Sequence, residues 1–365
     1  MRNKKITLLV GSLAGGGAEG VCVSLANGFS DAGYDVTLLV LNLNNAINQS
    51  RVSESVTLVN LDVSNVRYAF FTLRSYIKSN KIKQILVFDH LLSVLLVAIR
   101  YSLKSKFQIV SRNINTITKE LNSYSSFWYK VIVKKLVISF YKKVDFIINQ
   151  SKGMMDDLLD FYPEFNGRTI YIHNPVNEKI SNAIVDTTTC AKKDYFLCVG
   201  RLESQKAFHH AITSFSEFLV KHPHFQLKIV GIGELEESLK SLCASLNISD
   251  SVDFEGFQSD ILPYYIGAKA TLLTSKYEGF PNVLVESISL GTPVVSFNCP
   301  SGPSEIIKNG VNGFLVENLD VNEFTNSLEK IYNENLPKEK VIETANVYHL
   351  DNVIKKYIEV IESIK

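Results

Sequence analysis

The chain has 365 residues, 46% of them hydrophobic, and this length and composition favour two domains with large buried cores. The five cysteines show neither CxxC nor Cys/His spacing, and the apolar run at 91–99 is far shorter than the roughly 20 residues that span a bilayer. We therefore expect a soluble protein of a reducing cytosol. The formal net charge of +1 hides an excess of nine positive charges in residues 1–180, which acidic residues in the remainder nearly balance.

The first half of the chain alternates between strand-like and helix-like patterns. The basic N-terminus leads into an apolar run that is too short for a signal peptide, and we interpret it as the first strand. Seven short apolar runs are predicted strands, at 6–11, 36–42, 56–61, 84–89, 108–111, 146–151 and 169–174. Amphipathic segments between them predict a parallel sheet covered by helices on both faces. The expected first domain spans 1–178, and the polar, Thr-rich segment 179–194 is its linker to a second domain.

A glycine-rich turn, GSLAGGGAEG, follows the first predicted strand. Its spacing is not GxGxxG and no acid ends the second strand, so a nicotinamide cofactor is not expected. The three glycines at 15–17 are explained either by a bare backbone that passes close to a ligand or by a plain tight turn, and Glu19 at the following helix start is either a cap or a ligand.

The second half repeats the alternation, with strands predicted in YFLCVG, QLKIVG, VDFEG, ATLLTS, PVVSF and GFLVE. This domain spans 195–344, and an amphipathic helix is expected within 345–365. Two doubly wound α/β domains are therefore expected, with a ligand at the carboxyl ends of the strands.

The stretch ATLLTSKYEGFPNVLVE combines a buried strand, a tight loop and a helix start. Asn282 is the expected N-cap, and the N–H groups of residues 283–285 would favour a phosphate. Glu278 in the loop and Glu286 in the first turn would accept hydrogen bonds from sugar and ribose hydroxyls. Each carboxylate also has a plain explanation, as a solvated loop charge or as a complement to the helix dipole.

The nine residues EGFPNVLVE match the E-x7-E motif of the glycogen-synthase-like retaining glycosyltransferases, and the chain resembles that family. VGRLESQK matches the family's strand–GRL–x3–K–helix pattern. The resemblance is strongest over 195–316, and it implies the GT-B fold: two Rossmann-like domains facing a cleft, with the final helix packed back on the N-terminal domain.

The resemblance also implies the roles of individual residues. Arg201 and Lys206 would hold one diphosphate, Arg as a bidentate fork and Lys as a point charge, and Glu278 would hold the transferred sugar. The implied donor-binding residues are Gly16, Gly17, Gly200, Arg201, Lys206, Gly231, Gly233, Phe257, Glu278, Gly279, Phe280, Asn282, Val283, Leu284 and Glu286. SGPSE at 301–305 would close the site.

The acceptor side resembles the family less. Family members place a histidine at the end of a middle strand, beside the reacting centre. Here the corresponding strand end carries Arg112 and Asn113, while His90 ends a neighbouring strand. Either His90, as a catalytic residue, or Arg112 would face the acceptor, and His90 is equally explained as a core histidine. Gly15, Glu19, Arg112 and Asn113 are the expected acceptor-binding residues.

These expectations predict a retaining transferase that moves a hexose or N-acetylhexosamine from a UDP-sugar, with N-acetylgalactosamine as one candidate sugar. The expected acceptor is a polyprenyl-diphosphate-linked glycan of bacterial surface polysaccharide or oligosaccharide biosynthesis. No DxD spacing or His/Cys/acid cluster occurs, so we expect no metal and no cofactor. No nucleic-acid partner is expected. The alternatives are a nucleotide-sugar epimerase of the same architecture, which needs an acid/base pair and no acceptor groove, and a non-catalytic sugar-nucleotide sensor.

The segment 100–143 is strongly basic, with ten Lys and Arg against the single acid Glu120. Trp128, Ile132, Leu136 and Phe140 recur every four residues, which is typical of an amphipathic core helix. Trp128, Lys130, Lys134 and Lys135 would alternatively hold the protein on an anionic membrane surface. That interpretation predicts a cytoplasmic protein, peripheral on the inner face of the cell membrane. The oligomeric state is not indicated.

Overall fold

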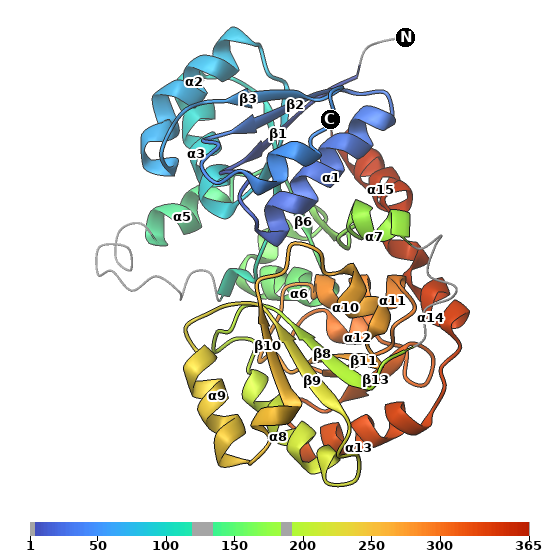
Figure 1. Cartoon of the computed structure of the whole chain (residues 1–365). Helices are drawn as coiled ribbons and strands as arrows, with labels where there is room; N and C mark the ends of the chain where they lie inside the picture. The colour runs from blue at the N-terminus through green and yellow to red at the C-terminus, as the bar shows by residue number, and fades with distance from the viewer. Residues whose placement is uncertain (1–3, 119–133, 184–191, 365) are drawn as a thin grey trace. The chain divides into compact units, whose positions relative to one another are not determined.

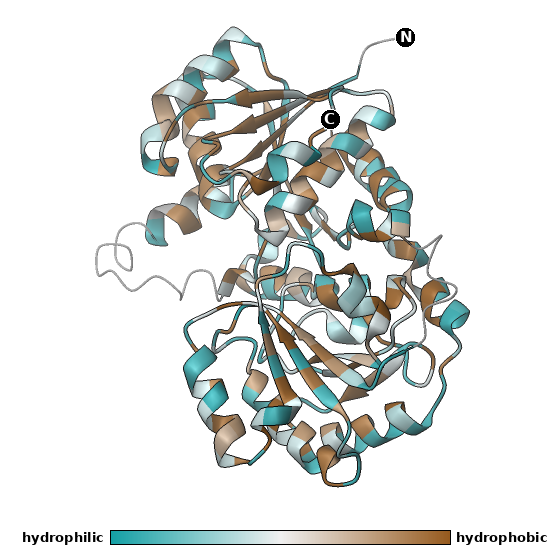
Figure 2. Ribbon diagram, viewed as in Figure 1, coloured by the Kyte–Doolittle hydropathy of each residue, from teal (hydrophilic) through white to brown (hydrophobic). Residues whose placement is uncertain are grey.

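The computed structural model describes residues 4–118, 134–183 and 192–364. The chain divides into two compact units, unit 1 with residues 1–175 and 350–365, and unit 2 with residues 176–349. Each unit contains its own parallel sheet with helices on both faces, and the strands of both sheets are predominantly hydrophobic (Figures 1 and 2). Part of the predicted linker is helical: α7 (Glu178–Ala183) begins at the last residue of the predicted first domain and continues into the linker, with Ile180 buried.

Unit 1 has a seven-stranded sheet in the order β3-β2-β1-β4-β5-β6-β7, and every described strand pair is parallel. Its strands are β1 (Lys5–Val10), β2 (Asp35–Val40), β3 (Thr57–Asn60), β4 (Gln84–Phe88), β5 (Gln108–Arg112), β6 (Phe146–Asn149) and β7 (Thr169–Tyr171). Its helices are α1 (Gly17–Asp31), α2 (Ala69–Ser79), α3 (His90–Leu103), α5 (Lys134–Tyr141), α6 (Lys152–Phe161) and α15 (Leu350–Ser363), with 3-10 turns η1 (Ile47–Arg51), η2 (Val66–Tyr68) and η4 (Pro163–Phe165).

Alternate residues of the strands enter two different cores of unit 1. Leu8 and its even-numbered neighbours pack with α1 and α15, whereas Leu9 packs in the core that α2, α3, α5 and α6 share. This alternation is the pattern that a sheet covered on both faces requires.

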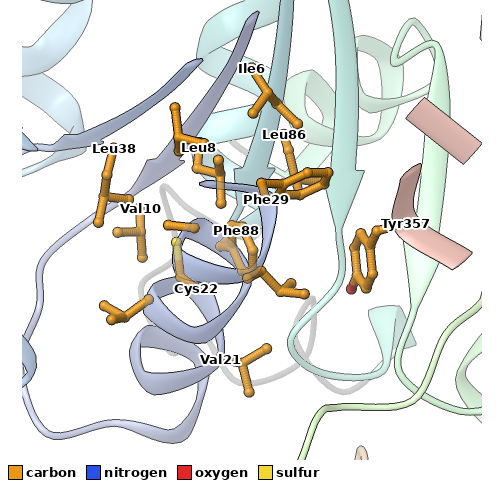
Figure 3. Packing of buried hydrophobic residues seen from close by; sticks show 14 of the residues in the cluster. Ile6, Leu8, Val10, Val21, Cys22, Phe29, Leu38, Leu86, Phe88 and Tyr357 are labelled. Carbon is orange, nitrogen blue, oxygen red and sulfur yellow. The ribbon is translucent and has the colours of Figure 1, made fainter. Parts of the chain in front are cut away.

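The C-terminal helix α15 packs against α1 (Figure 1). The Phe29 ring meets the Tyr357 ring edge-on, with 6.5 Å between centroids (Figure 3). A Cβ on Gly28 would lie 3.2 Å from Leu350, so the two helices approach closely there. Glu362 of α15 pairs with Lys4 and accepts a hydrogen bond from the Tyr34 hydroxyl. Residues far apart in sequence therefore complete one face of unit 1.

Unit 2 has a six-stranded sheet in the order β10-β9-β8-β11-β12-β13, again parallel throughout. Its strands are β8 (Tyr195–Val199), β9 (Gln226–Val230), β10 (Val252–Gly256), β11 (Ala270–Leu273), β12 (Val294–Phe297) and β13 (Gly313–Val316). Its further helices are α8 (Phe208–Leu219), α9 (Glu236–Ser245), α10 (Leu262–Gly267), α11 (Asn282–Ser289), α12 (Pro303–Ile306), α13 (Val321–Asn333) and α14 (Lys338–Ala345), with 3-10 turns η6 (Ser249–Ser251) and η7 (Asn346–Tyr348).

The predicted apolar stripe of segment 126–144 can be compared with the structure at Phe140. Trp128 and Ile132 lie outside the described residues. In the described part of α5, Val137 and Tyr141 are buried, and Phe140 is partly buried and packs against the core of unit 1. The position of Phe140 fits the interpretation of a core helix, and the rest of the stripe stays a prediction.

We predict that Tyr357→Phe lowers the free energy of unfolding by about 1–3 kcal/mol, because it removes the oxygen to which the buried Arg112 Nε donates at 2.8 Å. Urea denaturation, followed through the transition of unit 1, measures the effect. Tyr171→Phe, at a part-exposed tyrosine, is the control, and we expect a change within about 0.5 kcal/mol. Equal midpoints for the two variants would contradict the prediction.

Candidate functional site

The candidate donor-site residues of unit 2 come from loops at one edge of its sheet. Because all six strands are parallel, the loops that follow β8, β9, β11 and β12 leave the sheet at its carboxyl edge (Figure 1). β8 and β11 are direct neighbours, with Leu197 opposite Thr271. The loops carrying Lys206 and Glu278 therefore leave adjacent strands.

The loops after β8 and β9 lie backbone against backbone. A Cβ on Gly231, whose φ is +146°, would lie 1.8 Å from the Gly200 carbonyl oxygen, and one on Gly233 would lie 2.5 Å from the Leu202 oxygen. Leu202 N–H also donates to the Ile232 oxygen at 3.0 Å. Both glycines are thus required for this packing, whatever further role they have beside a ligand.

Lys206 and Glu278 form a largely buried ion pair. The distance from Lys206 Nζ to Glu278 Oε1 is 2.7 Å, and their side chains are 16% and 8% exposed. The buried Ser275 hydroxyl donates to the same Oε1 at 2.6 Å. Two donors therefore converge on one carboxylate oxygen, which fixes the orientation of Glu278.

Further hydrogen bonds hold the two loops together. Lys276 N–H donates to the Gln205 oxygen at 2.9 Å, and Gln205 Nε2 donates to the Tyr277 oxygen at 3.1 Å. The Thr274 hydroxyl donates to the Lys206 oxygen at 3.2 Å. One of these contacts joins two backbones and the other two join a side chain to a backbone, so the positions of Lys206 and Glu278 are set together.

Helix α11 begins differently from the prediction. Asn282 is its first residue rather than its N-cap, and Pro281 occupies the cap position without a side-chain hydrogen bond. Leu284 N–H donates to the Pro281 oxygen at 3.0 Å and is therefore occupied. Leu284 and Val285 also bury their side chains in the core, whereas Val283 is only partly buried.

Glu286 is the fifth residue of α11, so its predicted place in the first turn is wrong. The Tyr265 hydroxyl donates to Glu286 Oε2 at 2.9 Å. Burial, reinforced by the Glu286 charge, raises the pKa of Tyr265, so this hydroxyl stays protonated and remains a donor. Glu286 is thus a half-buried carboxylate held in place from α10.

The remaining predicted donor residues differ in exposure. Arg201 is 71% exposed and pairs with Glu203 at 2.9 Å rather than joining the Lys206–Glu278 pair. Phe257 is exposed, whereas Phe280 is buried and packs against Tyr348. The Phe280 side chain is therefore part of the core of unit 2. Gly279 beside it is part-buried.

In unit 1, the glycine turn precedes α1. Gly15, Gly16 and Gly17 are exposed, and Gly16 is at the cap position of the helix. A Cβ on Gly16 would lie 2.1 Å from Glu19 Oε2, so the Glu19 carboxylate folds back over the helix start. This position favours the capping interpretation of Glu19.

Arg112 and Asn113 are buried in unit 1, and their expected contact with an acceptor does not match this position. Arg112 donates to Tyr357 and to Asn174, and its guanidinium lies 5.2 Å from the Phe88 ring centroid. Asn113 Nδ2 donates to Asn149 Oδ1 at 2.8 Å. Both residues therefore hold elements of unit 1 together.

His90 is also buried, at the start of α3, with its ring edge-on to Tyr141 at 4.1 Å between centroids. Burial lowers its pKa to about 4, so it is neutral at physiological pH. This environment favours the core-histidine interpretation over a catalytic one.

Of the predicted membrane residues, Trp128 and Lys130 lie outside the described residues. Lys134 and Lys135 open α5, and Lys135 is exposed. Across the described ranges, no helix is long and apolar enough to cross a membrane. Over the same ranges, no cluster of three or more His, Cys, Asp or Glu side chains could hold a metal ion.

Two family descriptions match consecutive parts of the chain. "Glycosyltransferase Family 4" matches residues 15–179, and "Glycosyl transferases group 1" matches residues 182–347. The chain is a glycosyltransferase whose two halves match these two families. This confirms the resemblance drawn from the E-x7-E and GRL motifs, and glycosyltransferase activity follows from it.

Relatives of this glycosyltransferase are found in several bacteria. An uncharacterized glycosyltransferase of Haemophilus influenzae is 26% identical over 98% of both chains. The N-acetylgalactosamine-N,N'-diacetylbacillosaminyl-diphospho-undecaprenol 4-alpha-N-acetylgalactosaminyltransferase of Campylobacter jejuni is 30% identical over 56% of this chain and 55% of its own.

Solved structures match the whole glycosyltransferase. The apo lipopolysaccharide outer core galactosyltransferase WaaB has a TM-score of 0.75 and 21% identity, over 98% of this chain and 99% of its own. Anabaena HepE in complex with UDP has a TM-score of 0.75 and 17% identity, over 99% of this chain and 100% of its own. These matches, with the two parallel-sheet units, confirm the GT-B fold class.

Sequence reasoning missed Ser275, Gln205 and Tyr265, which position the charged residues of this glycosyltransferase. Ser275 offered a signal, because a small hydroxyl residue directly after a buried strand lies at the carboxyl edge where sites form. Tyr265 offered none, since its contact with Glu286 joins two helices.

We predict that Ser275→Ala lowers kcat/KM for the sugar donor about 10- to 100-fold, mainly through KM, because Glu278 Oε1 loses one of its two donors. Ser275→Thr keeps a hydroxyl and should retain most activity. Steady-state kinetics with thermal melting measure the effect, and Ser204→Ala, at the exposed serine beside Lys276, is the control. Wild-type kinetics for Ser275→Ala would rule out this positioning role.

Proposed function

We propose that the chain is a retaining, metal-independent glycosyltransferase that moves a hexose or N-acetylhexosamine from a UDP-sugar to a polyprenyl-diphosphate-linked glycan. The observation that carries the proposal is the Lys206–Glu278 pair, with Ser275 on the same oxygen. It brings a cation suited to a diphosphate and a carboxylate suited to sugar hydroxyls to neighbouring loops of one sheet edge.

In the proposed reaction, the bond between the sugar's anomeric carbon and the diphosphate oxygen breaks, and its electron pair leaves with UDP. The acceptor hydroxyl bonds to the anomeric carbon on the same face, and its proton departs with the diphosphate. Lys206 stabilises the charge that develops on the leaving group, and Arg201, which is exposed beside Glu203, swings onto the same diphosphate. Because these side chains supply the positive charge, no divalent ion is required.

Glu278 and Glu286 have different partners in this proposal. Glu278 Oε1 is occupied by Lys206 and Ser275, so Oε2 is the oxygen that accepts from the sugar hydroxyls. Glu286, held by Tyr265, accepts from the ribose. The choice of UDP is supported by the likeness to HepE, whose structure contains UDP.

The lipid-linked acceptor and the N-acetylgalactosamine candidate are supported by the Campylobacter jejuni relative, whose name specifies a diphospho-undecaprenol acceptor and that sugar. Such an acceptor would be used at the cytoplasmic face of a bacterial membrane, in the assembly of surface polysaccharide or oligosaccharide.

The first test measures transfer from a panel of labelled UDP- and GDP-sugars, with and without a polyprenyl-diphosphate glycan. We expect UDP-sugar consumption that depends on the acceptor, survives EDTA and yields a product whose anomeric configuration, read by NMR, equals that of the donor. Consumption without acceptor would indicate hydrolysis or epimerisation instead. Loss in EDTA that only a divalent ion restores would overturn metal independence.

We further predict that Arg201→Ala, Lys206→Ala and Glu286→Ala each reduce turnover at least a hundredfold, since removing one preorganised charged contact costs about 3–4 kcal/mol of transition-state stabilisation. Lys276→Ala, at an exposed lysine of the neighbouring loop, is the matched control and should stay within a few-fold of wild type. Melting temperatures separate lost chemistry from lost folding. Near-normal turnover in two of the three variants would reject the site.

A further inference from the structure

Among the described residues of unit 1, the most exposed aromatic side chains lie on η2, α2 and α3. Tyr68 in η2, Phe71 in α2 and Tyr101 in α3 are 69%, 79% and 59% exposed. Aromatic residues carry large apolar areas that proteins normally bury. Because η2, α2 and α3 contact one another, these aromatics point to a binding surface, whereas surface aromatics scattered singly need no such explanation.

The same elements are strongly basic. Residues 63–106 contain eight Lys and Arg and a single acid, Asp89. That acid is engaged within the fold, where its Oδ1 accepts from Leu92 N–H at the start of α3. The positive charge of this segment is therefore not neutralised by acids of its own sequence.

On α2, the aromatic and basic residues share a face. Phe71, Arg74 and Lys78 follow one another at spacings of three and four, which places them on one side of a helix. The opposite side, with Leu73 and Ile77, is buried against the sheet. The side of α2 that faces away from the sheet therefore carries one aromatic ring and two cationic side chains.

This stripe continues onto the neighbouring helices. Arg74 Nε donates to the Ser102 hydroxyl of α3 at 3.0 Å, and the adjacent Tyr101 ring lies 6.2 Å from that of Phe140 in α5. Figure 1 shows α2 beside α3 on one face of the unit 1 sheet, consistent with their packing. We call the set the α2–α3 surface, consisting of Arg67, Tyr68, Phe71, Arg74, Lys78, Tyr101 and Lys104.

We propose that the α2–α3 surface docks unit 1 onto an anionic phospholipid bilayer. A Tyr ring suits the headgroup boundary because it has an apolar body and a polar end, and a Phe ring inserts below that boundary. Each surface Lys or Arg near anionic lipid contributes about 1 kcal/mol. An anionic bilayer fits this surface because its negative charge complements the Lys and Arg side chains and its interface accommodates the exposed aromatic rings. The lipid-linked acceptor makes a membrane the natural partner, and in that respect the inference rests on the proposed function.

The α2–α3 surface differs from segment 126–144, for which the sequence suggested membrane binding. The described part of that segment turns Val137 and Tyr141 into the core, and Lys142 is paired with Glu164 at 2.9 Å. Among the described residues of unit 1, the most exposed aromatic side chains lie on η2, α2 and α3.

The test is sedimentation of the full chain with vesicles, without any sugar. Wild type should pellet with phosphatidylglycerol vesicles, less so at high salt, and not with phosphatidylcholine vesicles. The triple variant Arg67→Gln/Lys78→Gln/Lys104→Gln should bind at least tenfold more weakly, and Tyr68→Ser/Phe71→Ser should also bind more weakly. The control, Lys340→Gln/Lys355→Gln/Lys356→Gln, removes the same charge from exposed lysines elsewhere and should bind like wild type.

Equal binding by the two triple variants would overturn the proposal, and so would wild-type binding without a preference for anionic vesicles. Either result would leave a protein partner or a second copy of the chain to cover the α2–α3 surface. Release by Lys134→Glu/Lys135→Glu alone would return docking to α5. Transfer to a water-soluble acceptor analogue is measured in parallel. The charge-neutralised variant should retain it, so failure of docking is distinguishable from failure of the proposed reaction.

Discussion

The candidate site depends on keeping one ion pair, Lys206 with Glu278, largely out of water. Removing two charges from solvent costs several kcal/mol, and their attraction offsets that cost only when geometry and additional hydrogen bonds are good. Here Ser275 supplies a second donor to the Glu278 oxygen that Lys206 contacts, and the Gln205 contacts keep the two loops from separating. In the function that we propose, a pair held in this way is preorganised for a ligand that carries both a phosphate and hydroxyl groups.

The parallel sheet makes that pair possible. β8 and β11 are distant in sequence but hydrogen-bonded neighbours, so the loops that follow them leave the same edge side by side. Gly231 and Gly233 then let the next loop approach the β8 loop without side chains between them. This glycosyltransferase thus gathers charged side chains from separate loops onto one rigid edge.

Unit 1 uses its buried polar groups differently. Arg112 lies in the interior, where it joins β5 to Asn174 beyond β7 and to Tyr357 of the C-terminal helix. His90 and Asn113 likewise contact Tyr141. These residues lie at strand ends, as site residues do, yet they stabilise the unit. The exposed aromatics and cations of the α2–α3 surface, by contrast, contribute little to that core.

Local sequence determined the alternation of strands and helices, the two-domain α/β class and the E-x7-E and GRL motifs, because periodicity, glycine placement and short motifs are properties of neighbouring residues. It misjudged the start of α11 by one residue, because packing sets where that helix begins. Tertiary structure alone decided that Glu278 meets Lys206 and Ser275, that Tyr265 holds Glu286 and that Arg112 is buried beneath α15. Each of these contacts joins residues brought together by strand order or helix packing, which no local pattern records.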